Sequence, residues 1–413
     1  MARVIALFLL YLPVLGTEEL LATTYWVSKT GNDSYSCAQS QAESTPKLTI
    51  KSAVPCLAPG DTLFIKSGTY QEGVINNIPG GTSWSLPVTI AAYPGNTVIL
   101  VGRSGDDYVL DFTLSSKTYI AVERLVIDGA GLVGFPIWIE KGHHIRVKDC
   151  EIKNGVWQGL GVFSDGLTGA SYCEFINLDV HDNGKGSTEL GLRHGIYLAA
   201  SNCIVEGGTY YNNASHGIHV YIDPSSGKGT PNNNIVRNVR VYSNKYTGTG
   251  VYHGTGNQVY NNIVYGNGSG GGDPGIRVHA PNTTVANNTV YNNRGAGIYV
   301  SSYSNSSVKN NISYSNGGAA ILNEVTGTIL SNNLSIDPKF VDPASGNFKL
   351  QTGSSAIDAG STVSNVTKDF DGFARPQGAA CDIGAHEYMA GSSVPPPPTS
   401  AGPANLRIAA ATQ

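Results

Sequence analysis

Short segments in which apolar and variable residues alternate recur through the middle of the chain. Each has a small residue, an aliphatic residue, a variable residue and usually a second aliphatic residue. The segments are 193–198, 216–221, 249–253, 274–279, 296–300 and 320–324. This alternation is the pattern of a β-strand with one buried face. We therefore predict one strand per segment, with the variable residue on the exposed face.

A second phrase, which ends in two asparagines, recurs between these segments. Its second asparagine falls at intervals of 26, 23 and 22 residues, at Asn262, Asn288, Asn311 and Asn333. A period in the low twenties with two short strands per unit and no helical pattern is typical of a solenoid of stacked coils. Stacked asparagines can pass amide hydrogen bonds from coil to coil. We predict an all-β solenoid of about nine to eleven coils held partly by an asparagine ladder.

The composition agrees with this fold and limits the partners. The 413 residues include 51 Gly and 22 Tyr, and only 14% of them are charged, as expected for a turn-rich all-β chain. A solenoid can use this length as one unit. The net charge of −4 argues against nucleic acid or an anionic membrane as the partner.

The two ends of the chain differ in composition from the middle. An apolar run from Val4 to Leu15 behind Arg3 predicts a signal peptide over residues 1–22 and a secreted protein, extracellular or periplasmic. No stretch is long enough to span a membrane. The coils are expected within residues 23–388, and the Pro- and Ser-rich residues 389–413 read as a tail or linker.

Cysteine positions suggest one disulfide near the start of the solenoid. Cys37 and Cys56 flank a polar, turn-rich stretch and are expected to be joined. Cys173 and Cys203 fall in the same column one coil apart, where either a disulfide or two packed thiols would fit. The stretch 47–57 predicts a short amphipathic helix that would cap the first coil.

Phrases at both ends of the solenoid resemble secreted bacterial proteins of the pectate-lyase-like superfamily. At the start these are Tyr25-Trp26-Val27-Ser28, Pro59-Gly60-Asp61-Thr62 and Gly68-Thr69-Tyr70. At the end they are Asp337-Pro338-Lys339-Phe340, Arg375-Pro376 and Asp382-Ile383-Gly384-Ala385. The resemblance spans nearly the whole chain up to Tyr388. It implies a right-handed parallel β-helix with a cap at each end, a fold shared by lyases, glycosidases, epimerases and adhesins.

Aligning the coils on the small-aliphatic pair places the variable residues in one outward column. It reads Trp138, Gly161, Tyr197, His219, Tyr252, Arg277, Tyr299 and Leu322. A parallel column two residues further on includes Phe163, Tyr221, His279 and Glu324. Aromatic rings offer flat faces to sugars, and Arg and His donate to hydroxyls and carboxylates. The expected partner is an extended, acidic polysaccharide, bound by a monomer.

Two longer coils, with extra residues at 184–192 and 223–233, are expected to wall a cleft over this stripe. We predict Arg193, Tyr197, His219 and Arg277 as catalytic residues. The expected substrate-binding residues are Trp138, His194, His216, Tyr221, Asp223, Lys228, Tyr252, His279 and Tyr299.

The hypothesised reaction is β-elimination on a uronic-acid polymer. It needs a cation on the carboxylate, a base for the C5 proton and an acid for the leaving oxygen. Arg193 or Arg277 could be the cation, and His219, Tyr197 or Tyr252 could transfer the protons.

Arg193-His194-Gly195 is similar to a phrase of polysaccharide lyase family 6, in which the Arg takes part in acid/base chemistry. That resemblance implies Ca²⁺ as a cofactor, although the coil around Asp165 lacks the lysine base of that family. A glycoside hydrolase of the same fold and a non-catalytic glycan-binding or cell-surface protein are the alternatives.

Overall fold

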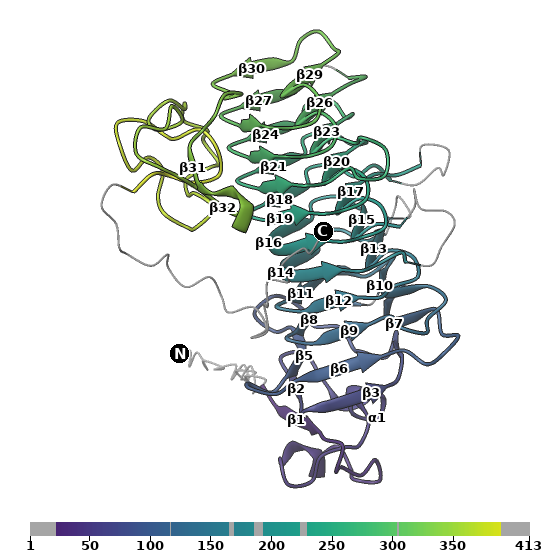
Figure 1. Ribbon diagram of the computed structural model, residues 1–413. Helices are drawn as coiled ribbons and strands as arrows, with labels where there is room; N and C mark the ends of the chain where they lie inside the picture. Colours follow the sequence, from purple (N-terminus) through teal and green to yellow (C-terminus); the bar gives the residue numbers. More distant parts are fainter. Residues whose placement is uncertain are drawn as a thin grey trace, which may run out of the picture.

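The chain folds into a tall stack of parallel β-coils (Figure 1). The computed structural model describes residues 22–115, 117–164, 169–185, 193–223, 229–303 and 305–389. Successive strands of each row pair in parallel, and one row has ten strands, which makes about nine full turns. The predicted all-β solenoid is confirmed.

The first row of strands runs along one face of the stack. It comprises β1 (Thr24–Val27), β2 (Thr62–Ile65), β5 (Val88–Ala92), β8 (Thr118–Glu123), β11 (His143–Lys148), the first part of β14 (Glu174–His181) and of β16 (Ile204–Tyr211), β18 (Ile235–Arg237), β21 (Gln258–Tyr260), β24 (Thr284–Ala286), β27 (Ser307–Lys309) and β30 (Ile329–Ser331).

The second row follows the first around a corner of each coil. It comprises β3 (Gly68–Gln71), β6 (Val98–Val101), β9 (Val126–Asp128), β12 (Glu151–Lys153), the last part of β14 and of β16, β19 (Arg240–Tyr242), β22 (Ile263–Tyr265), β25 (Thr289–Tyr291) and β28 (Ile312–Tyr314). Because β14 and β16 run through the corner, the two rows form one 20-stranded sheet.

The third row forms a separate ten-stranded sheet. It comprises β4 (Val74–Ile75), β7 (Tyr108–Phe112), β10 (Phe135–Ile139), β13 (Leu160–Phe163), β15 (Ile196–Ala199), β17 (Ile218–Val220), β20 (Thr249–Val251), β23 (Ile276–Val278), β26 (Ile298–Val300) and β29 (Ile321–Asn323). This row contains all six segments of the alternating pattern.

The hydrophobic core fills the inside of the stack. Aliphatic residues of the third row, such as Ile196, Leu198, Ile218 and Val220, are fully buried, as their alternation predicts. They pack in one continuous cluster with aliphatic residues of the other two rows. The variable residue between each pair consequently faces outward.

The two residues of each Asn-Asn pair have different structural roles. The first Asn, as at Asn261 and Asn287, adopts positive φ and turns the chain between the first and second rows, a conformation that Asn tolerates better than most residues. The second Asn forms the predicted ladder. For example, Asn288 Nδ2 donates to Asn311 Oδ1 at 2.9 Å.

A second ladder, not predicted from the sequence, follows the second row. It links Asn183, Asn213, Asn244, Asn267, Asn293 and Asn316 by amide hydrogen bonds of 2.9–3.0 Å.

The N-terminal end of the core is closed by short helical turns. These are η1 (Gln39–Gln41), α1 (Ile50–Ala53) and η2 (Val54–Cys56), and Ile50, Ala53 and Val54 join the main core cluster. The Glu72 carboxylate accepts the Ile50 and Lys51 backbone N–H groups at 3.0 and 2.9 Å. Cys37 and Cys56 form a disulfide. Cys173 and Cys203 are buried free thiols, which resolves the two alternatives.

The C-terminal segment packs beside the stack. Its antiparallel hairpin, β31 (Phe340–Asp342) and β32 (Asn347–Leu350), joined by η5 (Pro343–Ser345), packs with Ile263 and Ile312 of the second row. Figure 1 shows this segment at the side of the upper coils rather than over their end. The expected C-terminal cap therefore covers a face of the sheet, because Phe348 and its neighbours contact tyrosines of β22 and β25.

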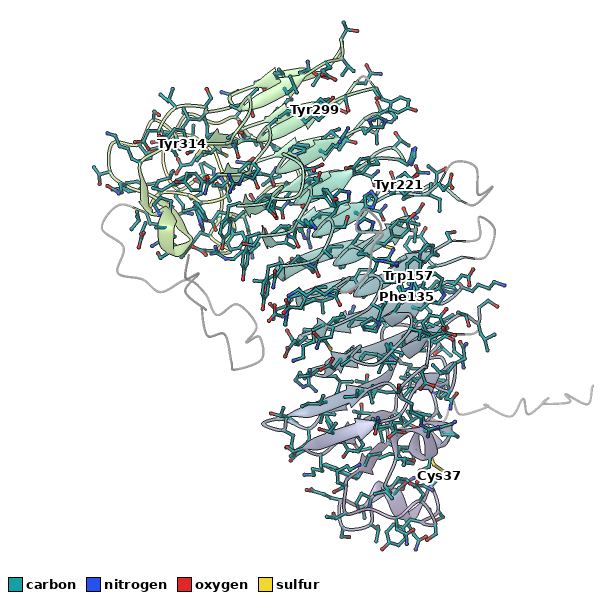
Figure 2. All side chains as sticks on the ribbon, turned by 45° about the vertical axis from the view of Figure 1, so that its right-hand side comes forward. Cys37, Phe135, Trp157, Tyr221, Tyr299 and Tyr314 are labelled. Carbon is teal, nitrogen blue, oxygen red and sulfur yellow. A yellow bond between two sulfur atoms is a disulfide. The ribbon has the colours of Figure 1, made fainter. Side chains whose placement is uncertain are left out.

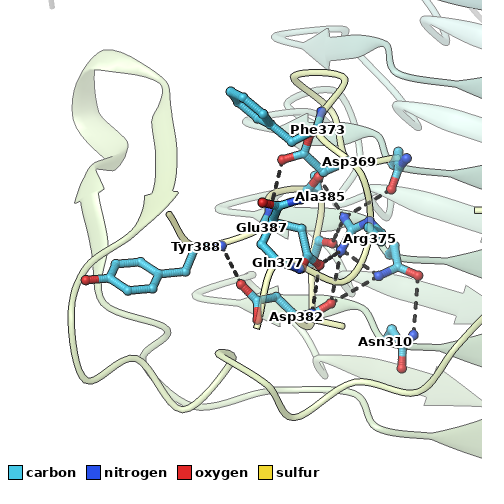
Figure 3. A network of polar contacts seen from close by, with 12 residues as sticks. Asn310, Asp369, Phe373, Arg375, Gln377, Asp382, Ala385, Glu387 and Tyr388 are labelled. Carbon is cyan, nitrogen blue, oxygen red and sulfur yellow. Dashed lines mark hydrogen bonds and ion pairs between the residues drawn. The ribbon is translucent and has the colours of Figure 1, made fainter. Parts of the chain in front are cut away.

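A buried ion pair fixes this segment (Figure 3). Arg375 Nη1 lies 2.5 Å from Glu387 Oε1, and both side chains are almost fully buried. Arg375 Nη2 donates to the Gly384 and Ala385 carbonyls at 2.9 Å and to Asn261 Oδ1, a corner residue of the stack, at 3.2 Å. The phrases around Arg375 and Gly384 are thus structural.

Within the part of the chain that the structure describes, no helix has the length and apolar character needed to cross a membrane.

Candidate active site

Strand pairing defines the outward column of the third row. It reads Asp111, Trp138, Gly161, Tyr197, His219, Gly250, Arg277, Tyr299 and Leu322. The alignment of coils predicted from the sequence was wrong in one coil. Gly250, not Tyr252, pairs with His219, because Thr249 takes the inward position that Ile218 has in the neighbouring coil. Tyr252 belongs to the second column, two residues further on.

Aromatic rings fill the two gaps that glycines leave in this column. A Cβ at Gly250 would lie 2.3 Å from the Tyr252 ring, and one at Gly161 would lie 2.9 Å from the Phe163 ring. Both rings therefore fold back over the glycine two residues before them. The glycines are required for this close approach, and the rings restore the continuity of the surface.

The result is a continuous line of rings, which we call the ring stripe. It consists of Tyr108, Phe135, Trp138, Phe163, Tyr197, His219, Tyr221, Tyr252, His279 and Tyr299. Ring centroids lie 4.2 Å apart for Trp138 and Phe163 and 4.7 Å apart for His219 and Tyr252. Figure 2 shows Phe135, Tyr221 and Tyr299 on one side of the stack at successive levels. From β7 to β26 the stripe crosses seven coil steps, roughly 34 Å.

Three histidines cluster at the centre of the stripe, and His219 is the one that belongs to it. His194 precedes β15, His216 precedes β17, and His219 lies within β17. His194 Nε2 and His219 Nδ1 are 2.9 Å apart, and the His216 ring stacks on the His194 ring with centroids 4.9 Å apart. His194 is fully buried and His219 is 7% exposed. The structure therefore brings together three of the predicted site residues from two adjacent coils.

Burial keeps these imidazoles neutral. It lowers the pKa of His194 and of His219 well below the ordinary value of 6.5, and neighbouring histidines add to the effect. Burial and the Arg277 charge lower the pKa of His216 to about 3. All three rings are consequently uncharged near neutral pH.

Hydrogen bonding then assigns the protons. The backbone N–H of His216 donates to His194 Nδ1 at 3.4 Å, so this nitrogen carries a lone pair. Neutral His194 must hold its proton on Nε2 and donate it to His219 Nδ1. Neutral His219 in turn holds its proton on Nε2. Of the two roles expected for His219, this arrangement favours a donor over a base.

Arg277 lies between two tyrosines of the stripe. Its guanidinium carbon is 5.4 Å from the Tyr252 ring centroid and 5.0 Å from that of Tyr299. Burial raises the pKa of Tyr252, and the Arg277 charge opposes that rise. Tyr299 Oη donates to Glu324 Oε2 at 2.6 Å. Arg277 is thus a half-buried cation between two aromatic rings, and part of it remains accessible to a ligand.

The other predicted residues lie around this centre. Tyr197 is 9% exposed, and burial raises its pKa. Arg193 is 5% exposed and packs on Trp157, with its guanidinium carbon 3.3 Å from the ring centroid, so it lies apart from Arg277. His279 Nδ1 is 3.1 Å from the Ser301 hydroxyl oxygen. Asp223 is exposed.

Lys228 and most of the predicted insertions, residues 186–192 and 224–228, lie outside the described residues.

The histidine cluster could be considered as a metal centre, because one nitrogen of each ring lies within 4.8 Å of the others. However, both nitrogens of His194 and Nδ1 of His219 are used in hydrogen bonds. Imidazole nitrogen also does not suit Ca²⁺, which prefers oxygen ligands. The cluster therefore fits a hydrogen-bonded unit better than a metal centre. Asp165, in the coil that was compared with family 6 for its calcium, lies outside the described residues.

A second group, Asp369, Asp371 and His386, lies in the C-terminal segment, away from the stripe. Asp369 accepts the backbone N–H groups of Phe373 and Glu387 at 2.8 and 3.0 Å, and Asp371 pairs with Lys349 at 2.9 Å. These bonds give the group a structural role.

Sequence reasoning missed the N-terminal end of the stripe. The Tyr108 ring stacks on Trp138, the Phe135 ring packs tilted against Trp138, and Asp111 pairs with Trp138 in the outward column. The strand 108–112 lacks the small-aliphatic pair that marked the other coils. Leu110 lies 27 residues before its partner Ile137, about one coil, and this spacing could have identified the strand.

Comparisons with known proteins agree on the fold. A family model for the right-handed β-helix region matches residues 166–336 and 221–367. The solved pectate lyase Pel9A has a TM-score of 0.58 and 16% identity, covering 89% of this chain and 96% of its own. XylC, solved with xylose, has a TM-score of 0.51 and 11% identity, covering 89% and 99%. No curated protein matches in sequence. The chain is a right-handed parallel β-helix, the fold that it shares with the solved pectate lyase Pel9A.

Proposed function

We propose that this protein is a secreted polysaccharide lyase that cleaves a uronic-acid polymer by β-elimination. The observation that carries the proposal is Arg277, a half-buried cation set between two rings of a stripe roughly 34 Å long, next to the neutral histidine cluster. A stripe of this length suits an extended chain of sugars. Its rings can stack on sugar faces, and its cation can bind a sugar carboxylate.

Arg277 is the proposed carboxylate-binding residue. Neutralising the uronate carboxylate makes the neighbouring C5 proton more acidic and stabilises the charge that develops when the proton leaves. A guanidinium can bind a carboxylate through two parallel hydrogen bonds. Tyr252 and Tyr299 flank Arg277 and would hold the sugar ring beside it.

Proton transfer is assigned to Tyr252 and His219. The Tyr252 ring lies 4.7 Å from the His219 ring and 5.4 Å from the Arg277 guanidinium carbon. In the elimination the C5–H bond breaks, a C4–C5 double bond forms, and the C4–O bond breaks with protonation of the leaving oxygen. As the phenolate, which the neighbouring Arg277 charge favours, Tyr252 would accept the C5 proton and then return it to the leaving oxygen, while the His219 Nε2–H donates a hydrogen bond to the substrate.

The test is product formation with a panel of alginate, pectate and glycosaminoglycans. The unsaturated uronide product absorbs ultraviolet light, so elimination is followed directly. Arg277→Ala is expected to lower kcat/KM about a thousandfold, or about 4 kcal/mol of transition-state stabilisation. Arg277→Lys is expected to recover part of the rate because it keeps the charge.

Matched substitutions elsewhere serve as controls. Tyr252→Phe is expected to abolish product formation, whereas Tyr242→Phe, in the second row, removes the same hydroxyl without effect. Arg294→Ala, at an exposed arginine, controls for Arg277→Ala. If no polymer gives an unsaturated product but binding persists, the protein is a glycan-binding module and the lyase proposal fails.

A further inference from the structure

A hollow lies at the N-terminal end of the ring stripe. It has a volume of about 390 Å³, and Lys51, Arg103, Asp107, Tyr108 and Asp111 are among the residues that line it. A neighbouring hollow of about 560 Å³ shares Lys51 and Arg103 with it. The two together extend the stripe toward the N-terminal helical turn α1.

Asp111 is the unusual residue of this hollow. Its side chain is 95% buried at the outward position of β7, next to Trp138 in the column. Oδ2 accepts a hydrogen bond from Asn76 Nδ2 at 2.9 Å. Oδ1 has no hydrogen-bond partner among the residues that the structure describes. A buried carboxyl with an unpaired oxygen costs stability, and such groups gather at binding and catalytic sites.

Aromatic rings form one wall next to this carboxyl. The Tyr108 ring stacks with those of Trp138 and Phe135, with centroid distances of 5.8 and 6.1 Å and interplanar angles near 25°. A flat aromatic wall beside hydrogen-bond acceptors is the usual surroundings of a sugar ring.

Basic side chains line the same hollow. Lys51 and Arg103 are both exposed. The Asp106 carboxylate accepts the Arg103 backbone N–H at 3.0 Å, which fixes the turn that carries the guanidinium. The hollow therefore offers donors for a carboxylate, acceptors for hydroxyls and a stacking face.

We infer that this hollow is a subsite for one uronate unit, with Tyr108 stacking on the ring, Asp111 and Asp107 accepting its hydroxyl groups, and Arg103 and Lys51 binding its carboxylate. The inference rests on the proposed function for the polymer class, but the binding itself needs no elimination step.

The distance from the hollow to the histidine cluster indicates what the subsite would do. Four coil steps separate Asp111 in β7 from His219 in β17, roughly 19 Å along the stack. A unit held there lies several sugars away from the proposed reacting bond. The subsite thus selects which bond of a long chain reaches Arg277 and Tyr252.

The inference is tested by calorimetric titration of the full chain with short oligogalacturonates, oligomannuronates and neutral xylo-oligosaccharides. Tyr108→Ala is expected to raise the Kd for one acidic oligosaccharide about tenfold, the equivalent of 1.4 kcal/mol. Arg103→Ala is expected to raise it similarly and to leave neutral ligands unaffected. Asp111→Asn keeps the shape of the side chain and is expected to raise the Kd a few-fold.

Two substitutions outside the hollow are the controls. Tyr172→Ala removes an exposed tyrosine just before β14, and Arg294→Ala removes an exposed arginine. Both are expected to leave the Kd unchanged. Thermal melting checks that each variant is folded, and Asp111→Asn remains informative if Tyr108→Ala unfolds.

The outcomes separate this inference from the lyase proposal. An unchanged Kd in Tyr108→Ala, Arg103→Ala and Asp111→Asn overturns the subsite, even if unsaturated product forms. Equal binding of neutral ligands with no effect of Arg103→Ala overturns its uronate specificity. Loss of binding in these variants without any unsaturated product supports the subsite and overturns the lyase.

Discussion

The asparagine ladders and the ring stripe are two stacks built on the same coils, and they follow opposite rules. In a ladder one residue type repeats at each step and every amide bonds to the next, as from Asn244 to Asn267 to Asn293. In the outward column that carries the stripe the residue changes at nearly every step, from Trp138 through Tyr197 and His219 to Arg277.

The difference comes from what each stack faces. The ladder side chains are buried, so each polar group must find its partner within the protein. The third-row column faces outward, where a ligand can supply the partner. Repetition therefore indicates architecture here, and variation on the same scaffold indicates a binding surface.

The largest expected effect is on the pH dependence of stability. The histidines beside the stripe titrate, whereas the asparagines of the ladders do not. The folded pKa of each clustered histidine lies below 6.5, so the unfolded chain takes up protons first as the pH falls. Stability is therefore complete above about pH 6.5 and declines as the pH drops toward the folded pKa values. Three groups give a slope of up to about 4 kcal/mol per pH unit.

Denaturant unfolding between pH 7 and pH 5, read by circular dichroism, measures that slope. His216→Gln is expected to reduce it by about a third. A stability that stays flat over this interval would contradict the neutral, buried state assigned to the cluster.

A ladder substitution should lower stability without changing ligand binding. Asn267→Ala removes the acceptor of the Asn244 amide and the donors to Val241 and Asn293. Leaving these buried groups unpaired is expected to cost about 3 to 4 kcal/mol. Chemical denaturation measures the loss, and the exposed Asn323→Ala is the control. A change in sugar affinity with stability intact would remove the distinction between ladder and stripe.

Replacing the buried carboxyl of Asp111, in the outward column, should raise the stability of the fold, whereas the ladder substitution lowers it. Burial raises the pKa of Asp111 from 3.8 to about 6. The folded state then holds the proton longer than the unfolded state, so stability falls as the pH rises from about 4 to 6. Asp111→Asn cannot ionise and is expected to be more stable than the parent at pH 7 by about 2 to 3 kcal/mol.

Melting temperatures of both forms at pH 4.5 and pH 7 check the sign. The gain should shrink at the lower pH. A variant that is less stable at pH 7 would show that the carboxylate is stabilising, and would remove the contrast with the ladder.

The smallest effect is expected at the C-terminal end of the stripe. Tyr299→Phe removes an exposed hydrogen bond to Glu324. The free energy of unfolding should change by less than about 0.5 kcal/mol. Sugar affinity should fall only two- to threefold, or about 0.5 kcal/mol, because the ring that stacks remains. Titration of both forms with one oligosaccharide measures this, and a complete loss of binding would move the site centre toward Tyr299.

The sequence predicted the columns better than the contacts within them. The positions of Tyr197, His219, Arg277 and Tyr299 followed from the alternation, because each of these residues lies between two buried aliphatic residues of its strand. Tyr252 was misplaced by two residues because Gly250-Val251 imitates the small-aliphatic pair. The ladder through Asn244 was missed because its residues resemble ordinary turn asparagines.

The sequence by itself determined the coil period, the inward and outward faces and one ladder, because alternation and period are properties of the local chain. Only the tertiary structure decided which side chains of different coils meet. It set the tautomer of His219 through His194, folded the Tyr252 ring over Gly250 and buried Asp111 beside Tyr108. These features depend on strand register and on burial, which arise only when one coil is stacked on the next.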